Sequence, residues 1–202
     1  LLEEESTSEN PVLDSQNAYS NRFHSIGGNA AYSVMANTLR GMYGTDVLIA
    51  TGNSFTGSVL KAEYTEKMVG DMIMPNDLSA YSCKMSGAKL KETVRNFVEG
   101  YQGGFIPFNR GSLPVFSGIS VEIRETDDGY TLSKVTRDGK KVQDDDTFTV
   151  TCLAIPKHME AYPTEDQVVF TGGDTSVEDT WIGYVLEGDA ILAEPEDYMT
   201  LR

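Results

Sequence analysis

The third quarter of the chain restricts the fold more than any other part, because apolar and polar residues alternate there in short segments. These segments are 118–124, 130–136 and 148–154. The pairs Asp128-Gly129 and Asp138-Gly139 stand in the connections that follow the first and second segments. A period of two places successive side chains on opposite faces of a strand, and aspartate-glycine pairs between such runs are a strong hairpin signal. This region therefore predicts antiparallel, hairpin-rich β-structure.

Helical patterns on both sides of this region exclude an all-β fold. In residues 87–99, apolar side chains recur with helical spacing opposite a charged face, and Ser86 stands at the N-cap position. Other helices are predicted at 29–42, at 66–72 as a short helix or turn, and at 177–186, and other strands at 46–50 and 78–85. The sequence thus predicts an α+β domain, with a mixed, hairpin-rich β-sheet and helices packed against it.

The beginning of the chain differs in composition from the rest. Residues 1–20 open with a polar, acidic run and predict a linker or poorly ordered arm, so the domain itself is expected over 21–202. The first residue is leucine, and neither a signal peptide nor a lipidation motif follows it, which predicts a piece of a longer protein. No segment approaches the ~18 continuous apolar residues of a membrane span.

Charge excludes one class of partner. The formal net charge is −15 at pH 7, with 31 acidic and 16 basic residues. An acidic surface repels phosphate backbones, so we expect no nucleic acid as a partner.

The two cysteines leave two alternatives open. Cys83 and Cys152 each fall on the apolar face of a predicted strand, and their spacing matches no zinc motif. They are either buried free thiols or a pair joined across neighbouring strands. Neither alternative gives them a catalytic role.

The usual residues of a hydrolytic centre are missing from the sequence. The only histidines, His24 and His158, are far apart, and neither belongs to a motif with metal-ligand spacing. No nucleophile elbow and no phosphate-binding glycine loop occurs. The run of three aspartates, 144–146, lacks the glycine and the spaced ligands of a calcium loop and predicts a solvated turn. The sequence predicts no catalytic residue and no metal site within this chain.

The order of several short motifs resembles the C-terminal domain of the 5′-nucleotidase family. The similar segments are Gly28-Asn29, 44–50, 86–92, 113–119 and 145–151. In the family these segments correspond to a Gly-Asn helix start, a Gly-Ala-Asp-Ile-Ala strand, a Thr-Gly-x-x-Leu-Lys helix start, a Val-Ser-Gly-Leu segment and a Tyr-Thr-Val-Ala strand. The resemblance runs in order from about Arg22 to the end of the chain.

The resemblance implies a division of labour between two domains. In this family an N-terminal metallophosphoesterase domain holds two divalent metal ions and the catalytic residues, while the C-terminal domain stacks the base between aromatic rings and meets phosphate or ribose with arginines. The chain would then be the substrate-recognition domain of a secreted 5′-nucleotidase-type hydrolase of nucleotide catabolism, not catalytic by itself. The implied partners are that N-terminal domain and a nucleotide or nucleoside. The implied location is extracellular, at the cell surface or periplasmic.

Five residues occupy positions where the resemblance places substrate contacts. Arg22 falls within one residue of the family's first arginine, and Asn53 and Phe55 lie in the loop that corresponds to its glycine-rich loop. Asn76 stands where the family has a phenylalanine after a proline, and Tyr162 is available to replace the second stacking ring.

The sequence departs from the family pattern in these same loops. Residues 51–57 lack the arginine that ends the family's glycine-rich loop, and Asn76 cannot stack on a base as phenylalanine does. A charge-assisted hydrogen bond contributes about 1.5–3 kcal/mol, so losing two would weaken nucleotide affinity by orders of magnitude. The departures predict a pocket that binds a different ligand or no nucleotide. The alternative function is a non-catalytic binding or structural module of a large surface protein that keeps the fold.

Overall fold

The computed structural model describes residues 11–15, 17–18, 29–56, 58–59, 61–73, 78–99, 114–127, 129–154, 169–170, 176–188 and 192–202. The helices are α1 (Ala30–Tyr43), η1 (Gly52–Ser54, a 3-10 turn), α2 (Glu66–Gly70), α3 (Gly87–Val98) and α4 (Val177–Leu186). The strands are β1 (Leu13–Ser15), β2 (Val47–Thr51), β3 (Ala62–Tyr64), β4 (Ser79–Ser86), β5 (Pro114–Ser117), β6 (Ser120–Thr126), β7 (Gly129–Arg137), β8 (Lys140–Lys141), β9 (Thr147–Ala154), β10 (Val169–Phe170) and β11 (Met199–Leu201).

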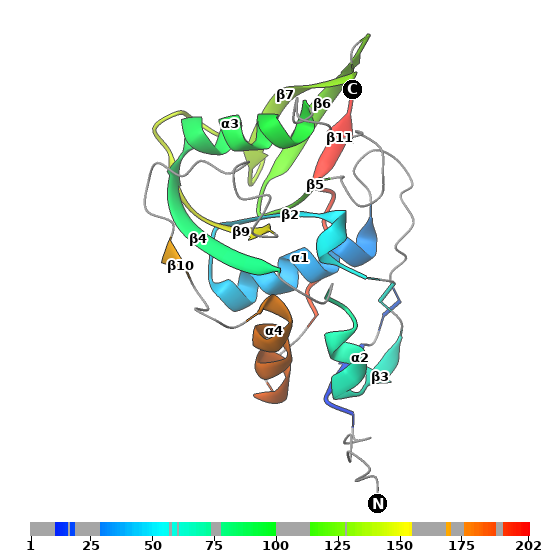
Figure 1. The fold of residues 1–202 in the computed structure, drawn as a ribbon. Coiled ribbons are helices and arrows are strands. Elements are labelled where there is room, and N and C mark those ends of the chain that lie inside the picture. The colour runs from blue at the N-terminus through cyan, green and yellow to red at the C-terminus, as the bar shows by residue number, and fades with distance from the viewer. Residues whose placement is uncertain are drawn as a thin grey trace, which may run out of the picture.

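A mixed sheet of five strands forms the centre of the molecule, in the order β10-β4-β9-β2-β5 (Figure 1). Strands β2 and β9 are parallel, and the other pairs in this sheet are antiparallel. Residues 47–50 are entirely apolar and fully buried, as expected of a central strand. Strand β5 has only four residues and begins with Pro114, which explains why alternation did not reveal it.

The alternating region forms a second sheet, β11-β6-β7-β8, that extends from the top of the molecule in Figure 1. Strands β6 and β7 are the predicted hairpin, with a register shift between Glu122 and Ile123. The inward-facing residues Val121, Ile123 and Val135 are buried, while Arg124 and Glu125 are exposed. Together with the four α-helices, the two sheets confirm the predicted mixed α+β architecture.

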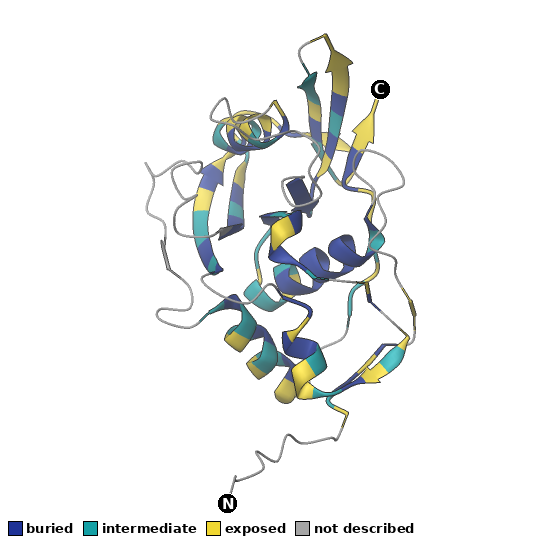
Figure 2. Cartoon of the chain, turned by 45° about the vertical axis from the view of Figure 1, so that its right-hand side comes forward, coloured by how far each residue is buried: buried dark blue, intermediate teal, exposed yellow. Residues whose placement is uncertain are grey.

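Helix α1 is buried on nearly its whole circumference and lies against β2 and β5 (Figure 2). The Asn29 side chain caps it by accepting a hydrogen bond from the Tyr32 amide at 3.0 Å. Gly44 ends it in the left-handed conformation, with φ 62°. Ser33 is buried because its hydroxyl donates to the carbonyl of Glu196 and accepts from the amide of that residue. The chain near the C-terminus thereby satisfies a polar position on α1.

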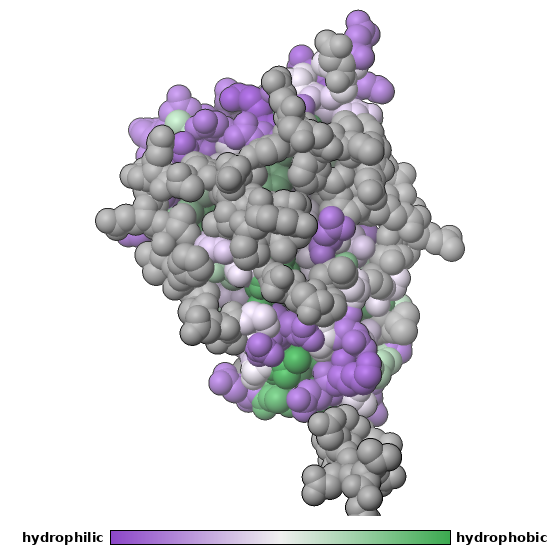
Figure 3. Space-filling model, viewed as in Figure 1, coloured by the Kyte–Doolittle hydropathy of each residue, from purple (hydrophilic) through white to green (hydrophobic). Residues whose placement is uncertain are grey.

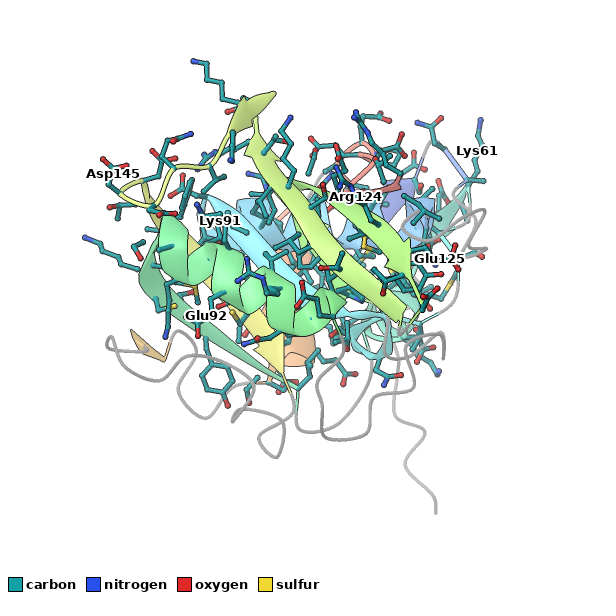
Figure 4. All side chains as sticks on the ribbon, turned by 90° about the horizontal axis from the view of Figure 1, so that it is seen from above. Lys61, Lys91, Glu92, Arg124, Glu125 and Asp145 are labelled. Carbon is teal, nitrogen blue, oxygen red and sulfur yellow. The ribbon has the colours of Figure 1, made fainter. Side chains whose placement is uncertain are left out.

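Helix α3 confirms the predicted amphipathic pattern and its cap. The Ser86 hydroxyl accepts a hydrogen bond from the Lys89 amide at 3.2 Å. Leu90 and Val94 are fully buried over β4 and β9, and charged residues, among them Lys91 and Glu92, cover the outer surface (Figures 3 and 4). The aspartate run at 144–146 is a turn beside this helix, and Asp144 forms an ion pair with Lys91.

Helix α4 packs on the short helix α2 at the lower end of the molecule (Figure 1). Ser176 caps α4, since its hydroxyl accepts a hydrogen bond from the Asp179 amide at 3.0 Å. Trp181 is fully buried, and its indole nitrogen donates to the Val69 carbonyl at 3.1 Å. Leu186, at the end of α4, is 51% exposed. Figure 3 shows a hydrophobic area over α4.

The first twenty residues contain a structured segment that their composition did not indicate. Strand β1 pairs antiparallel with β3, and Leu13 is buried. Only three residues form this strand, which is too short for a visible alternation. Strand β1 thus lies before the expected boundary at residue 21, which itself stays a prediction.

Both cysteines are free thiols, the first of the two alternatives. In the β4–β9 ladder, Cys83 stands opposite Val150 and Cys152 opposite Tyr81, so the two cysteines are diagonal neighbours. Burial raises the pKa of both thiols, most strongly that of the fully enclosed Cys152. The protonated, enclosed thiol of Cys152 is unreactive, whereas Cys83 is only partly buried.

Among the described residues, no helix has the length and hydrophobicity needed to cross a membrane.

Candidate functional site

The carboxyl ends of the parallel strands β2 and β9 lie at one edge of the central sheet, here called the recognition edge. At this edge β2 continues into η1, while β4 and β5 begin, since Ser79 pairs with Ala154 and Pro114 with Thr51. Helix α1 also begins here, because the Tyr32 ring lies 5.6 Å from the Phe55 ring. The carboxyl ends of parallel strands are the usual position of ligand sites in open α/β sheets.

The structure describes two of the five predicted substrate-contacting residues. Asn53 is exposed in η1, directly after β2, where its amide is open to a ligand. Phe55 is only 3% exposed and packs against Tyr32, so its ring contributes to the core beneath the edge. Contact between these residues and a substrate stays a prediction.

The other three predicted residues, Arg22, Asn76 and Tyr162, lie outside the described residues. Along the sequence, Arg22 precedes the start of α1, Asn76 precedes β4 and Tyr162 follows β9. Of the described elements that these connections adjoin, the start of α1, the start of β4 and the end of β9 lie at the recognition edge.

The recognition edge offers hydrogen bonding and packing. The amide of Asn53 is exposed at this edge, and Tyr198 lies buried near Tyr32 with its pKa raised by desolvation. Within the described part of the chain, no group of three or more histidine, cysteine, aspartate or glutamate side chains could hold a metal ion. The described groups are suited to orienting a ligand.

The opposite edge of the sheet, where β2 and β9 begin, contains a charged cluster that sequence reasoning missed. One oxygen of Asp46 accepts from the amide and the hydroxyl of Thr149, at 2.8 and 2.7 Å. The other oxygen accepts from Nη2 of Arg137 at 2.9 Å. Gly118, with φ +80°, lies directly against the Asp46 carbonyl, where a Cβ atom would overlap it. We call this cluster the Asp46 clamp.

The Asp46 clamp explains why the recognised motifs occur together. Asp46, Gly118 and Thr149 come from three of the segments that resemble the family, 44–50, 113–119 and 145–151. The clamp joins the starts of β2 and β9 to the turn that follows β5. These motif residues therefore hold the sheet together at the edge opposite the recognition edge.

Removing the Asp46 charge should destabilise the domain. We expect Asp46→Asn to lower the free energy of unfolding by about 1–2 kcal/mol. This loss is smaller than the loss expected for a fully buried charged network, because the Asp46 side chain is 35% exposed. Urea denaturation at neutral pH measures the loss. Asp127→Asn, an exposed aspartate in the β6–β7 turn, removes the same charge and should change the stability little. Equal effects of the two variants would contradict the clamp.

Acid should weaken the same clamp. Partial burial alone would raise the pKa of Asp46, but hydrogen bonds from Thr149 and the Arg137 guanidinium outweigh it and hold the pKa below its usual value. A lowered pKa contributes stability that is complete above the unfolded-state pKa of about 3.9 and is lost as the pH falls through the folded-state pKa. The stability difference between wild type and Asp46→Asn should therefore shrink as the pH falls through the folded-state pKa of Asp46. A constant difference down to acid pH would contradict this assignment.

Comparisons with known proteins identify the family to which the sequence and the fold correspond. The sequence matches the family described as 5′-nucleotidase, C-terminal domain, over residues 6–155. A search of curated proteins finds no match to this chain.

Solved structures of low sequence identity share the fold. A 5′-nucleotidase precursor from Thermus thermophilus superposes with a TM-score of 0.73 at 12% identity, covering 96% of this chain and 40% of that one. The NAD nucleotidase of Haemophilus influenzae has a TM-score of 0.65 at 14% identity and covers 97% of this chain and 39% of that one. The sulfate thiohydrolase SoxB of Thermus thermophilus has a TM-score of 0.67 at 9% identity, with coverages of 95% and 35%.

The chain thus spans two fifths or less of the length of these three proteins. The family match covers most of the sequence, and the fold agrees over almost the whole chain. This chain belongs to the 5′-nucleotidase C-terminal domain family.

Proposed function

We propose that this chain is the substrate-recognition domain of a secreted 5′-nucleotidase-type phosphoester hydrolase. The observation that carries the proposal is topological: β2 and β9 end, and α1 and β4 begin, at the recognition edge, where Asn53 is exposed in η1. Family membership supplies the class of reaction. The catalytic residues and the pair of divalent metal ions would belong to a metallophosphoesterase domain that precedes this chain in the same polypeptide.

The altered loop residues predict which part of a nucleotide this domain binds. The family's arginine is absent from 51–57, and Asn53 is the exposed polar side chain directly after β2. An amide binds neutral hydrogen-bonding groups, such as those of a base or a sugar, better than it binds a phosphate. Recognition of a nucleoside portion, with weak affinity for the phosphate, fits the described residues.

The parent polypeptide provides a test of the proposed function. Its sequence before this chain should contain the Asp-x-His, Gly-Asp-x-x-Asp and Gly-Asn-His blocks of a metallophosphoesterase. Expressed as a whole with divalent metal ions, it should release phosphate from a 5′-nucleotide, with secretion measured in the same cells. Absence or mutation of these blocks would support the alternative, a binding or structural module that has lost nucleotide recognition.

Asn53 provides a test within the domain. We expect Asn53→Ala to raise the KM of the parent enzyme for its nucleotide about tenfold by removing one ligand hydrogen bond, while kcat changes little. Because the side chain is exposed, the stability should stay within about 0.5 kcal/mol of wild type. Asn96→Ala, an exposed asparagine on α3, is the matched control. An unchanged KM would remove Asn53 from the recognition site.

A further inference from the structure

A hollow lies beside the Asp46 clamp, away from the recognition edge. It has a volume of about 280 Å³ and lies among the last turn of α1, the β5–β6 and β7–β8 turns, and the segment before β11. Arg40 and Arg137 both line it, together with Gly118 and Ser120. Two guanidinium groups from distant parts of the sequence therefore meet at one small cavity.

Arg40 is held in place from one side. Its Nε donates to the Ser117 hydroxyl at 2.8 Å, and this hydroxyl donates to Oδ1 of Asn37 at 2.5 Å. Asn37 is fixed in turn by a hydrogen bond from its amide nitrogen to the Glu194 carbonyl. Arg40 forms no ion pair with another described residue. Its terminal nitrogens are thus oriented without a carboxylate partner in the described part of the chain.

Arg137 is held from the opposite side of the hollow. Asp46 accepts from one of its terminal nitrogens, and its guanidinium carbon lies 5.5 Å from the centre of the Phe148 ring. The stacking and the ion pair together fix the plane of the guanidinium. Both arginines are therefore positioned before any ligand arrives, which lowers the entropy cost of binding.

The acidic groups nearby do not cancel both positive charges. Asp46 is already occupied by Arg137 and Thr149. Asp138 has a 90% exposed side chain and lies 3.8 Å from Nε of Arg137, and Glu196 is also exposed at the margin. Water screens exposed charges of this kind strongly. The positive charge of Arg40 remains unbalanced within the hollow.

We propose that this hollow binds a small oxyanion, a phosphate or carboxylate group, between Arg40 and Arg137. Guanidinium groups bind both anions through paired hydrogen bonds, and a volume of about 280 Å³ lies below the usual range of about 300–1,000 Å³ for drug-sized ligands. The site lies at the edge opposite the recognition edge, so it is independent of the proposed nucleotide site.

Titration of the chain with inorganic phosphate, and separately with succinate, at constant ionic strength tests the proposal. Backbone amide shifts of residues 117–120 and 139 report binding by NMR. We expect saturable shifts, and Arg40→Gln should weaken the affinity about tenfold. Arg124→Gln removes the same charge from the exposed face of β6 (Figure 4) and should leave the affinity unchanged. Tighter binding of phosphate or of succinate identifies which anion the site prefers.

Two results would overturn the site. One is the absence of saturable shifts with either anion, and the other is an equal loss of affinity in Arg40→Gln and Arg124→Gln. Thermal denaturation first establishes that the variants fold. If Arg40→Gln does not fold, Arg40→Lys keeps the charge but loses the paired geometry, and unchanged affinity in that variant would also contradict the proposal.

Discussion

Replacing Gly87 by alanine should destabilise the domain by about 3 kcal/mol. A Cβ atom on Gly87 would overlap the carbonyl oxygen of Gln143 and lie 3.0 Å from Cγ1 of Val142. The obstacle is backbone, which cannot rotate away as a side chain does. The Gly87 amide also donates to the Asp146 carbonyl at 2.7 Å, so a shift of α3 would break the contact that holds its first turn to the 143–146 turn.

Urea denaturation followed by tryptophan fluorescence measures this loss. Gly183→Ala in α4 is the matched control, because a Cβ atom there meets nothing within 4 Å. Alanine should stabilise this helical position by about 0.5–1 kcal/mol. Equal stabilities of the two variants would show that α3 does not press against the 143–146 turn as described.

Replacing Trp181 by alanine should cost about 3–5 kcal/mol, the range measured for large aromatic residues in cores. Trp181 is fully buried and joins α4 to α2 through its hydrogen bond to the Val69 carbonyl. The variant leaves a cavity and removes the indole hydrogen bond, two costs that add, although the Val69 carbonyl still accepts a hydrogen bond from the Met72 amide at 3.1 Å.

The measurement must use circular dichroism, because Trp181 is the only tryptophan of the chain. Trp181→Phe separates the two costs, since it keeps most of the apolar contact and loses only the hydrogen bond. It should therefore cost roughly 1–2 kcal/mol. If alanine at this position cost no more than phenylalanine, the packing of α4 on α2 would not be as the structure shows it.

The long elements could be predicted from the sequence because several local signals agree in them. In α3, periodicity, the Ser86 cap and the charged face all indicate the same helix. The β6–β7 hairpin has alternation and an aspartate-glycine turn. Short elements such as β1, β5 and β8 carry too few residues for a pattern and depend on pairing with distant strands.

The candidate site could be predicted only in part, for a different physical reason. The recognised motifs persist because Asp46, Gly118 and Thr149 hold the strand starts together, and a change at any of them is costly. Loops in general carry fewer packing constraints than strands and change residue type more freely. Sequence resemblance therefore identifies the family reliably and the ligand poorly.

No local sequence pattern predicts the hollow that Arg40 and Arg137 line. The two arginines are separated by 97 positions and belong to no motif. Their surroundings meet through the antiparallel pairing of β2 with β5 and through the β7–β8 turn. Contacts of this kind follow from topology, which local patterns do not specify.

The central claim, recognition of a nucleotide or nucleoside at the carboxyl ends of β2 and β9, is tested most directly by NMR titration of this chain with AMP, adenosine and a nucleotide sugar. We predict amide shifts at Asn29, Asn53 and Ser54, with AMP affinity weaker than micromolar because residues 51–57 lack an arginine. Residues 117–120 should not respond to adenosine, which carries no oxyanion. The absence of shifts at the recognition edge with all three ligands at millimolar concentration would contradict the account.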